Sequence, residues 1–168
     1  GRFSVGGATI RYLAPLPPIT EAEATATFSM RRFDFAVRSG RVGALELSDG
    51  AVNIWDIGAP KEWLSLTTVI RGPVRAALEL LAHPRLDLLS NVGLTPKGTA
   101  GSQSTRLKVT LPLDDKLAGA DVAVVSTSRI QGLALPNVVG GKGIDNGTAM
   151  LTVDNAALKA EGAARYIG

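Results

Sequence analysis

Residues 22–38 read AEATATFSMRRFDFAVR, and apolar and polar side chains alternate along them. Every even-numbered position from 22 to 30 is apolar, and Phe33, Phe35 and Val37 continue the alternation in the second half of the stretch. Successive side chains of a β-strand point to opposite faces, so this period of two indicates strands with one buried face. We predict one strand over Ala22–Met30 and a second over Arg32–Arg38, with Met30-Arg31 turning between them.

Comparable short strands follow along the rest of the chain. The segments Ser48-Asp49-Gly50, Asp145-Asn146-Gly147 and Asp154-Asn155 favour tight turns, and Asp-Gly is a strong hairpin signal. Strands joined by short turns are typical of an antiparallel meander, not of parallel units with helical crossovers. The further predicted strands are Val42–Leu47, Ala51–Ile57, Trp63–Arg71, Thr99–Leu111, Ala120–Ile130, Gly147–Val153 and Ala157–Ile167.

One segment has the period of a helix. From Val74 to Leu81, apolar residues recur at i, i+3, i+4 and i+7 and form one apolar stripe. Pro73 suits the first helical turn, and Pro84 pushes the residue before it out of the helical region. The predicted fold class is therefore mainly β: an antiparallel sheet with one short α-helix at Pro73–Ala82.

The composition of the chain excludes several classes of function. Its 168 residues suit a single domain, and 45% hydrophobic with 20% charged residues is typical of a globular chain. The net charge of +3 is small and scattered, which argues against nucleic acid as a partner. The sequence has no cysteine, so it forms no disulfide and no thiolate site.

The two ends of the sequence have strand character. The chain starts at Gly1-Arg2-Phe3, ends in Ala164–Gly168, and has neither a signal peptide nor an apolar run of about 18 residues. We therefore interpret residues 1–168 as a single β segment of a longer protein.

A weak internal repeat supports that interpretation. Ile10–Pro17 resembles Ile130–Pro136, and a predicted hairpin follows each copy, at Ala24–Val37 and at Thr148–Ala163. Two copies indicate a unit that adds strands along an axis.

The predicted elements are unequal in size. Nine or ten strands spaced ~4.8 Å apart make a sheet roughly 40 Å wide, whereas a helix of ten residues is only ~15 Å long. The helix can cover two or three strands, so the remaining apolar face must be covered in another way. Either the sheet closes on itself as a sandwich or barrel, or a ligand supplies the missing apolar layer.

The order of the motifs resembles the AsmA-like domain of the AsmA/TamB/YhdP superfamily of bacterial envelope proteins. The resemblance covers nearly the whole chain, through patterns of Gly, Pro and alternating apolar residues. The residues that carry it are Leu13–Thr20 with the hairpin after it, Ser39–Gly43, Arg71-Gly72-Pro73 before the helix, His83-Pro84, Gly93–Pro96, Gly101, Leu133–Val138 and Asp145–Gly162.

That resemblance implies a function and a compartment. The family's proteins are long, periplasmic and anchored in the inner membrane, and their repeated β segments form an open, taco-like groove thought to carry phospholipid toward the outer membrane. This chain would then be one non-enzymatic section of such a groove, without a cofactor. Its partners would be an acyl-chain lipid and neighbouring β segments of the same protein, with the membrane anchor outside these residues.

The alternating apolar residues are the candidate lining of the groove. A lipid tail gains ~0.8 kcal/mol per buried methylene, so a continuous apolar track needs no specific polar contact. Ordinary packing of the same side chains against one another is the alternative. The candidates for lipid binding are Phe28, Met30, Phe33, Phe35, Val37, Leu45, Leu47, Val52, Ile54, Leu107, Val109, Val122, Val124, Met150 and Leu158.

No group of residues makes a convincing catalytic or metal site. His83 stands at a predicted helix end, and sequence neighbours such as Asp114-Asp115 point to opposite faces of a strand or into solvent. Glu21 and Glu23 would share a strand face, as a weak cation site or, more simply, as a solvated surface. Gly140–Gly143 lacks the spacing of a phosphate-binding loop.

Two rival functions remain open. A closed β-sandwich could serve as a scaffold or interaction module of the envelope, in which Trp55 and Trp63 would pack at strand ends or meet a partner. An enzyme that uses the single histidine, His83, is the other rival, and it would require a nucleophile beside that residue.

Overall fold

The computed structural model contains one antiparallel sheet of nine strands and a single helix, α1 (Val74–Leu81). It describes residues 1–11, 15–84, 89, 95–113, 121–139, 141–155 and 157–167. The strands are β1 (Arg2–Ile10), β2 (Ile19–Phe28), β3 (Arg32–Val42), β4 (Leu45–Trp55), β5 (Trp63–Pro73), β6 (Ala100–Pro112), β7 (Ala123–Val139), β8 (Lys142–Val153) and β9 (Leu158–Ile167).

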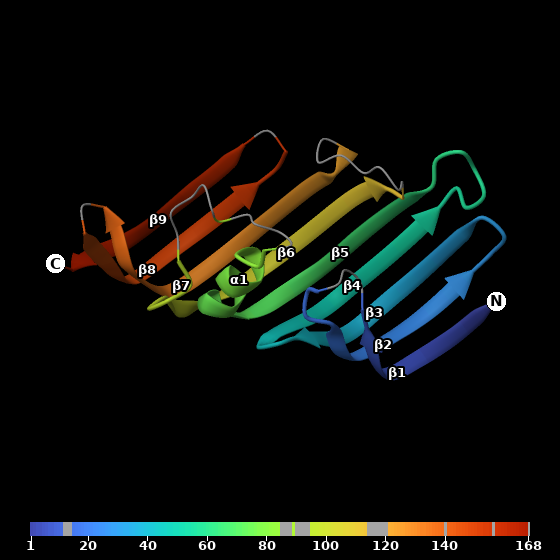
Figure 1. Cartoon of the computed structure of the whole chain (residues 1–168), viewed down its shortest axis with the longest axis horizontal. Helices are drawn as coiled ribbons and strands as arrows, with labels where there is room; N and C mark the ends of the chain where they lie inside the picture. Colours follow the sequence, from blue (N-terminus) through green and yellow to red (C-terminus); the bar gives the residue numbers. More distant parts are fainter. Residues whose placement is uncertain are drawn as a thin grey trace.

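The sheet is open. Its strands lie side by side in chain order, each antiparallel to the next, and β1 and β9 form its two edges (Figure 1). The N-terminus and the C-terminus therefore lie at opposite ends of the molecule (Figure 1). This confirms the predicted class, a mainly β chain with an open antiparallel sheet and one short helix. The closed sandwich or barrel, the other way to cover an apolar face, is not the fold of this chain.

Register divides the sheet into an apolar face and a polar face. Directly opposed residues of antiparallel strands point to the same side, so all residues of one paired row lie on the same face of the sheet. One such row across β1–β7 contains Phe3, Ala26, Phe35, Val52, Leu66, Val109 and Val124. The adjacent row contains Arg2, Thr27, Asp34, Asn53, Ser65, Thr110 and Ala123.

The helix covers a small part of the sheet. α1 follows β5 directly, with Pro73 as its N-cap and Ala82 as its C-cap, and it packs on β5 and β6 through the buried Val74 (Figure 1). Its predicted position, Pro73–Ala82, is confirmed. Its eight residues span ~12 Å, whereas nine strands ~4.8 Å apart span roughly 38 Å. Among the described residues, no helix has the length and apolar character needed to cross a membrane.

Two predicted turns are wrong, and both are β-bulges. β4 runs straight through Ser48-Asp49-Gly50, where Asp49 has φ 51° and the register with β5 slips. β8 likewise runs through Asn146, at φ 50°. Asn and Asp tolerate the left-handed conformation that a bulge needs as readily as the one that a turn needs, so the local sequence does not distinguish them.

The remaining turns lie close to their predicted places, with one exception. The β3–β4 turn is at Gly43-Ala44, so the strand predicted over Val42–Leu47 is divided between β3 and β4. The β8–β9 turn is at Asp154, as predicted: its backbone N–H donates to the Ala157 carbonyl over 3.0 Å. β3 and β7 are longer than predicted, since both continue past the point where the alternation changes phase.

The internal repeat is present in the pairing of the strands. A constant offset in sequence number converts the register of β1–β2, including its bulges, into that of β7–β8. The same offset converts the β2–β3 pairs from Ala24↔Val37 to Phe28↔Phe33 into β8–β9 pairs, whereas the bulges of β2–β3 and β8–β9 differ. The offset aligns Ile10 with Leu135, not with Ile130 as the sequence suggested, and residues 12–14 lie outside the described part. The corresponding pairs are Ile10↔Ile19 with Leu135↔Ile144, Ala8↔Ala22 with Leu133↔Gly147, and Phe28↔Phe33 with Val153↔Leu158.

Candidate functional site

The apolar face of the sheet is the candidate site. It brings together most of the predicted lining residues, which come from β2, β3, β4, β6, β7 and β9 and lie in neighbouring rows. Those on this face are Phe28, Phe33, Phe35, Val37, Leu45, Leu47, Val52, Ile54, Leu107, Val109, Val124 and Leu158. Val122 lies just before β7, two positions from Val124, and its carbonyl accepts a 2.6 Å hydrogen bond from Asn155 Nδ2.

Two of the predicted residues lie elsewhere. Met30 is in the β2–β3 turn and is 96% exposed, because the strand ends at Phe28 before the alternation reaches it. Met150 pairs with Arg129 and Glu161 on the polar face, since Leu151 is the residue of β8 that points to the apolar side. Neither methionine is part of the apolar face.

Several residues of the apolar face were absent from the prediction. The alternation Trp63-Leu64-Ser65-Leu66-Thr67 contained the signal for β5, and Ala149, Leu151 and Val153 contained it for β8. Phe3 belongs to an edge strand that the sequence did not identify as part of the sheet. The added members are Phe3, Leu64, Leu66, Ile70, Leu111, Ala149, Leu151 and Val153.

Four phenylalanines form a continuous aromatic cluster at the β1–β3 end of this face. Phe28 and Phe33 stack with their ring centroids 5.5 Å apart, and Phe33 stacks on Phe35 at 6.0 Å. Phe3 closes the cluster at 6.2 Å from Phe28 and 6.5 Å from Phe35. Phe3 and Phe28 are still 43% and 42% exposed, so the cluster is a surface and not a closed core.

Most of the buried interior of the protein lies at the α1 end of the sheet. Within the described part of the chain no large side chain is fully buried, and most of the buried apolar residues lie near the helix and the turns at that end. They include Val42, Leu45, Val74 and Ile130. Ala26, 1% exposed in the row of Phe3 and Phe35, is buried away from that end. Toward the opposite end, residues such as Leu66 and Val109 are only partly buried, by their strand neighbours. This half of the face can therefore receive an apolar ligand without unfolding any core.

A small polar group interrupts the apolar face on β5, β6 and β7. Thr68, 4% exposed, donates from Oγ1 to the Ser48 carbonyl over 3.2 Å, beside the bulge in β4. Thr105 Oγ1 donates to Gln103 Oε1 and lies 2.8 Å from Ser128 Oγ. The register rows that contain these residues carry no charged side chain, so this part of the described face is neutral.

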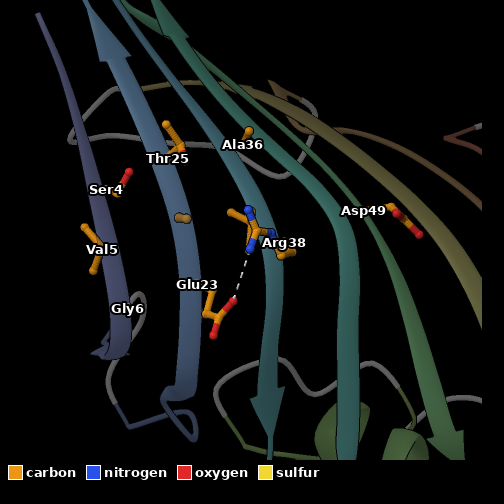
Figure 2. Close-up of a pocket in the computed structure, with 10 residues that line it drawn as sticks. Ser4, Val5, Gly6, Glu23, Thr25, Ala36, Arg38 and Asp49 are labelled. Atoms are coloured by element: carbon orange, nitrogen blue, oxygen red, sulfur yellow. Dashed lines mark ion pairs between the residues drawn. The ribbon is translucent and has the colours of Figure 1, made fainter.

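The polar face carries the charges. A hollow of about 430 Å³ lies on it over β1–β4, where Arg38 Nη1 approaches Glu23 Oε2 to 3.8 Å (Figure 2). Figure 2 shows this pair reaching across from β2 and β3, with Asp49 of β4 standing apart. Both members of the ion pair are well exposed, so it contributes little to stability. The bulge at Glu21 also removes the regular alternation that would have put Glu21 and Glu23 on one face.

A second charged group on the polar face is better ordered. Asp34 accepts hydrogen bonds from Arg32 Nε, at 2.7 and 2.8 Å, and from Asn53 Nδ2 at 2.6 Å. The hydrogen bond from Arg32, followed by that from Asn53, lowers the pKa of the Asp34 carboxyl.

The other residues considered as catalytic, phosphate-binding or partner-binding candidates lie at turns, at strand ends or outside the described residues. His83 follows α1, and its backbone N–H donates to the Leu80 carbonyl over 3.2 Å. Gly141 is in the β7–β8 turn, whereas Gly140 and Asp114-Asp115 lie outside the described residues. Trp55 and Trp63 stack at 6.3 Å as a cross-strand pair, with Lys61 Nζ 4.8 Å from the Trp63 ring. In the part of the chain that the structure describes, no group of His, Asp or Glu could hold a metal ion.

Comparison of the chain with family models, with curated proteins and with solved structures finds no match.

Proposed function

We propose that this chain is a non-enzymatic section of an apolar groove that holds the acyl chains of a phospholipid. The observation that supports the proposal is the difference in size between the apolar face of the sheet and the helix that covers it. A nine-stranded sheet presents an apolar face, and a helix of eight residues covers only its β5–β6 part. The rest of this face has no protein layer in the described chain, and an apolar surface of that extent marks a binding site.

The chemistry of the face suits hydrocarbon. Its rows combine Leu, Val, Ile, Phe and Ala without charge, and each methylene transferred from water to such a surface gains ~0.8 kcal/mol. Covering about ten methylenes would gain roughly 8 kcal/mol before the cost of ordering the chain. Binding of this kind depends on area and not on shape, so a lipid could move along the face.

The cellular setting of the proposal comes from the family resemblance. Proteins with the AsmA-like pattern of Gly, Pro and alternating strands are periplasmic and anchored in the inner membrane. We extend that setting to this chain: a periplasmic section of a protein that carries phospholipid toward the outer membrane. The register repeat of β1–β3 in β7–β9 supports neighbouring β segments of the same protein as its partners.

An interaction module is the second candidate, and the two edge strands favour it. Every described residue of β9 is exposed, and β1 is exposed along most of its length. Unpaired strand edges recruit other strands, so a protein partner could bind there without any lipid.

Lipid extraction followed by mass spectrometry tests the proposal. The purified protein is expected to carry phospholipid, and Val109→Lys on the apolar face should remove most of it. Val125→Lys is the matched control, since Val125 is 50% exposed and pairs with Lys108 on the polar face. Equal lipid in both variants, or none in the wild type, would reject the groove. A stoichiometric protein partner without lipid would favour the interaction module.

A further inference from the structure

Gln103 has a feature that the fold does not explain. Its side chain is only 7% exposed, and its Nε2 is buried without any hydrogen-bond partner. Leaving a buried donor without an acceptor costs about 1–3 kcal/mol, so folded proteins rarely retain such a group without a use for it. Leucine or methionine at this position would have avoided the cost.

The rest of the Gln103 amide is held in place. Thr105 uses its single hydroxyl proton to donate to Gln103 Oε1. Ser128 therefore donates to Thr105 Oγ1, across a distance of 2.8 Å. This chain of hydrogen bonds holds the carbonyl end of the amide and leaves Nε2 without an acceptor. Because Nε2 is buried, the amide has to move toward the surface for a ligand on the face to reach it.

The position of this group on the sheet is specific. Gln103 pairs with Gly72 and Ile130, and Thr105 pairs with Ile70 and Ser128, in adjacent rows of the apolar face. Thr105 and Ser128 are partly exposed, so the network opens onto that face. Beyond it, on the side away from α1, β6 continues with Leu107, Val109 and Leu111.

The apolar part of β6 is long enough for one acyl chain. Six residues separate Thr105 from Leu111, which corresponds to ~20 Å of strand. One leaflet of a bilayer spans ~15 Å of hydrocarbon, half of a core ~30 Å thick. A single acyl chain with its ester beside Thr105 and Gln103 would therefore run along β6 past Leu107 and Val109 and end before Leu111.

We propose that Gln103, held by Thr105 and Ser128, binds the ester carbonyl of an acyl lipid lying in the groove. This inference rests on the proposed function and adds a fixed point to an otherwise featureless track. An ester carbonyl is a neutral acceptor, and it suits a neutral amide in a neutral part of the described face better than a phosphate would. A lipid would pause at this point with its ester in register.

Two ligands of similar length separate this contact from hydrocarbon binding. Methyl palmitate has one ester carbonyl, and heptadecane has none; both are measured by displacement of a fluorescent fatty acid. The ratio of their dissociation constants is compared between wild type and Gln103→Met, so that the different solubilities of the ligands in water cancel. Loss of one hydrogen bond should shift the ratio by roughly 3- to 10-fold toward the alkane in the variant.

A spectroscopic measurement accompanies the affinities. With a ¹³C-labelled ester carbonyl, the infrared stretch of the bound ester should lie at lower frequency in wild type than in Gln103→Met. Gln131→Met is the matched control, because Gln131 is exposed and pairs with Ser102 on the other face. It should leave both the ratio and the stretch unchanged.

The possible failures are distinguishable. If neither ligand displaces the probe from wild type, the groove itself is rejected. If both bind and Gln103→Met changes neither the ratio nor the stretch, the groove stands and the ester contact is rejected. Should Gln103→Met not fold, Thr105→Val replaces it: the amide is then no longer oriented, and the ratio should shift in the same direction by a smaller factor.

Discussion

At the scale of single residues, Asp34 on the polar face makes the stability of the protein depend on pH. Hydrogen bonds from Arg32 and Asn53 lower the pKa of Asp34 below that of the unfolded chain, ~3.9. The stability that Asp34 contributes is therefore present above about pH 4 and is lost as the pH falls through the lower, folded-state value. Between pH 5 and 2.5, the melting temperature of wild type should fall further than that of Asp34→Asn.

Arg32→Gln provides the control for this residue. It removes the guanidinium that has the larger effect on the Asp34 pKa, so its melting temperature should depend on acid less than that of wild type. Parallel acid profiles for wild type and both variants would show that Asp34 has no part in acid unfolding.

Residue faces were predictable from the sequence only where the alternation stayed in phase. Phe33, Phe35 and Val109 were placed on the correct side of the sheet because regular pairing surrounds them. Met150 was not, although the regular alternation of Ala149, Leu151 and Val153 places it in the opposite phase. Nothing in the sequence indicated the buried Nε2 of Gln103, because the lack of a partner is a property of the packed structure.

At the scale of elements, glycine determines where one bulge can form. Gly101, the second residue of β6, has φ 115°, and a Cβ there would lie 2.9 Å from the carbonyl oxygens of Gln131 and Gly132 on β7. Gly101→Ala adds backbone strain and this collision, and should lower the free energy of unfolding by about 1–3 kcal/mol in denaturant titration. Gly6→Ala is the matched control, since a Cβ on Gly6 meets no atom within 4 Å; equal effects of the two would contradict this account.

The elements themselves were predictable to different degrees. The helix was found because Pro73, Pro84 and a 3.6-residue period agree on its limits. The turns at Asp49 and Asn146 were wrong for one physical reason: both residues take the left-handed conformation, but inside a strand whose pairing continues on both sides. Only the neighbouring strand decides between a bulge and a turn, and a local sequence does not contain it.

At the scale of the whole molecule, the repeat specifies what the β9 edge can bind. β9 is the register counterpart of β3, and the other edge of β3 pairs with β4. By this equivalence Leu158 corresponds to Phe33, which faces Ile54, and Ala160 corresponds to Phe35, which faces Val52. A strand with the pattern of β4 would extend the apolar face across β9 without a change of side.

A synthetic peptide of residues 43–57, GALELSDGAVNIWDI, tests this equivalence. It should slow hydrogen exchange of β9 amides, because their outward N–H groups gain ladder partners, and leave the amides of β5 unaffected. A peptide with the same residues in scrambled order is the control, since it loses the alternation while keeping the composition. If both peptides protect β9 equally, or if protection appears on β1 instead, the β9 edge binds strands without regard to their sequence and the repeat does not determine its partner. Protection of β9 by the ordered peptide alone would show that the sheet reads its next strand by the same register that joins β3 to β4.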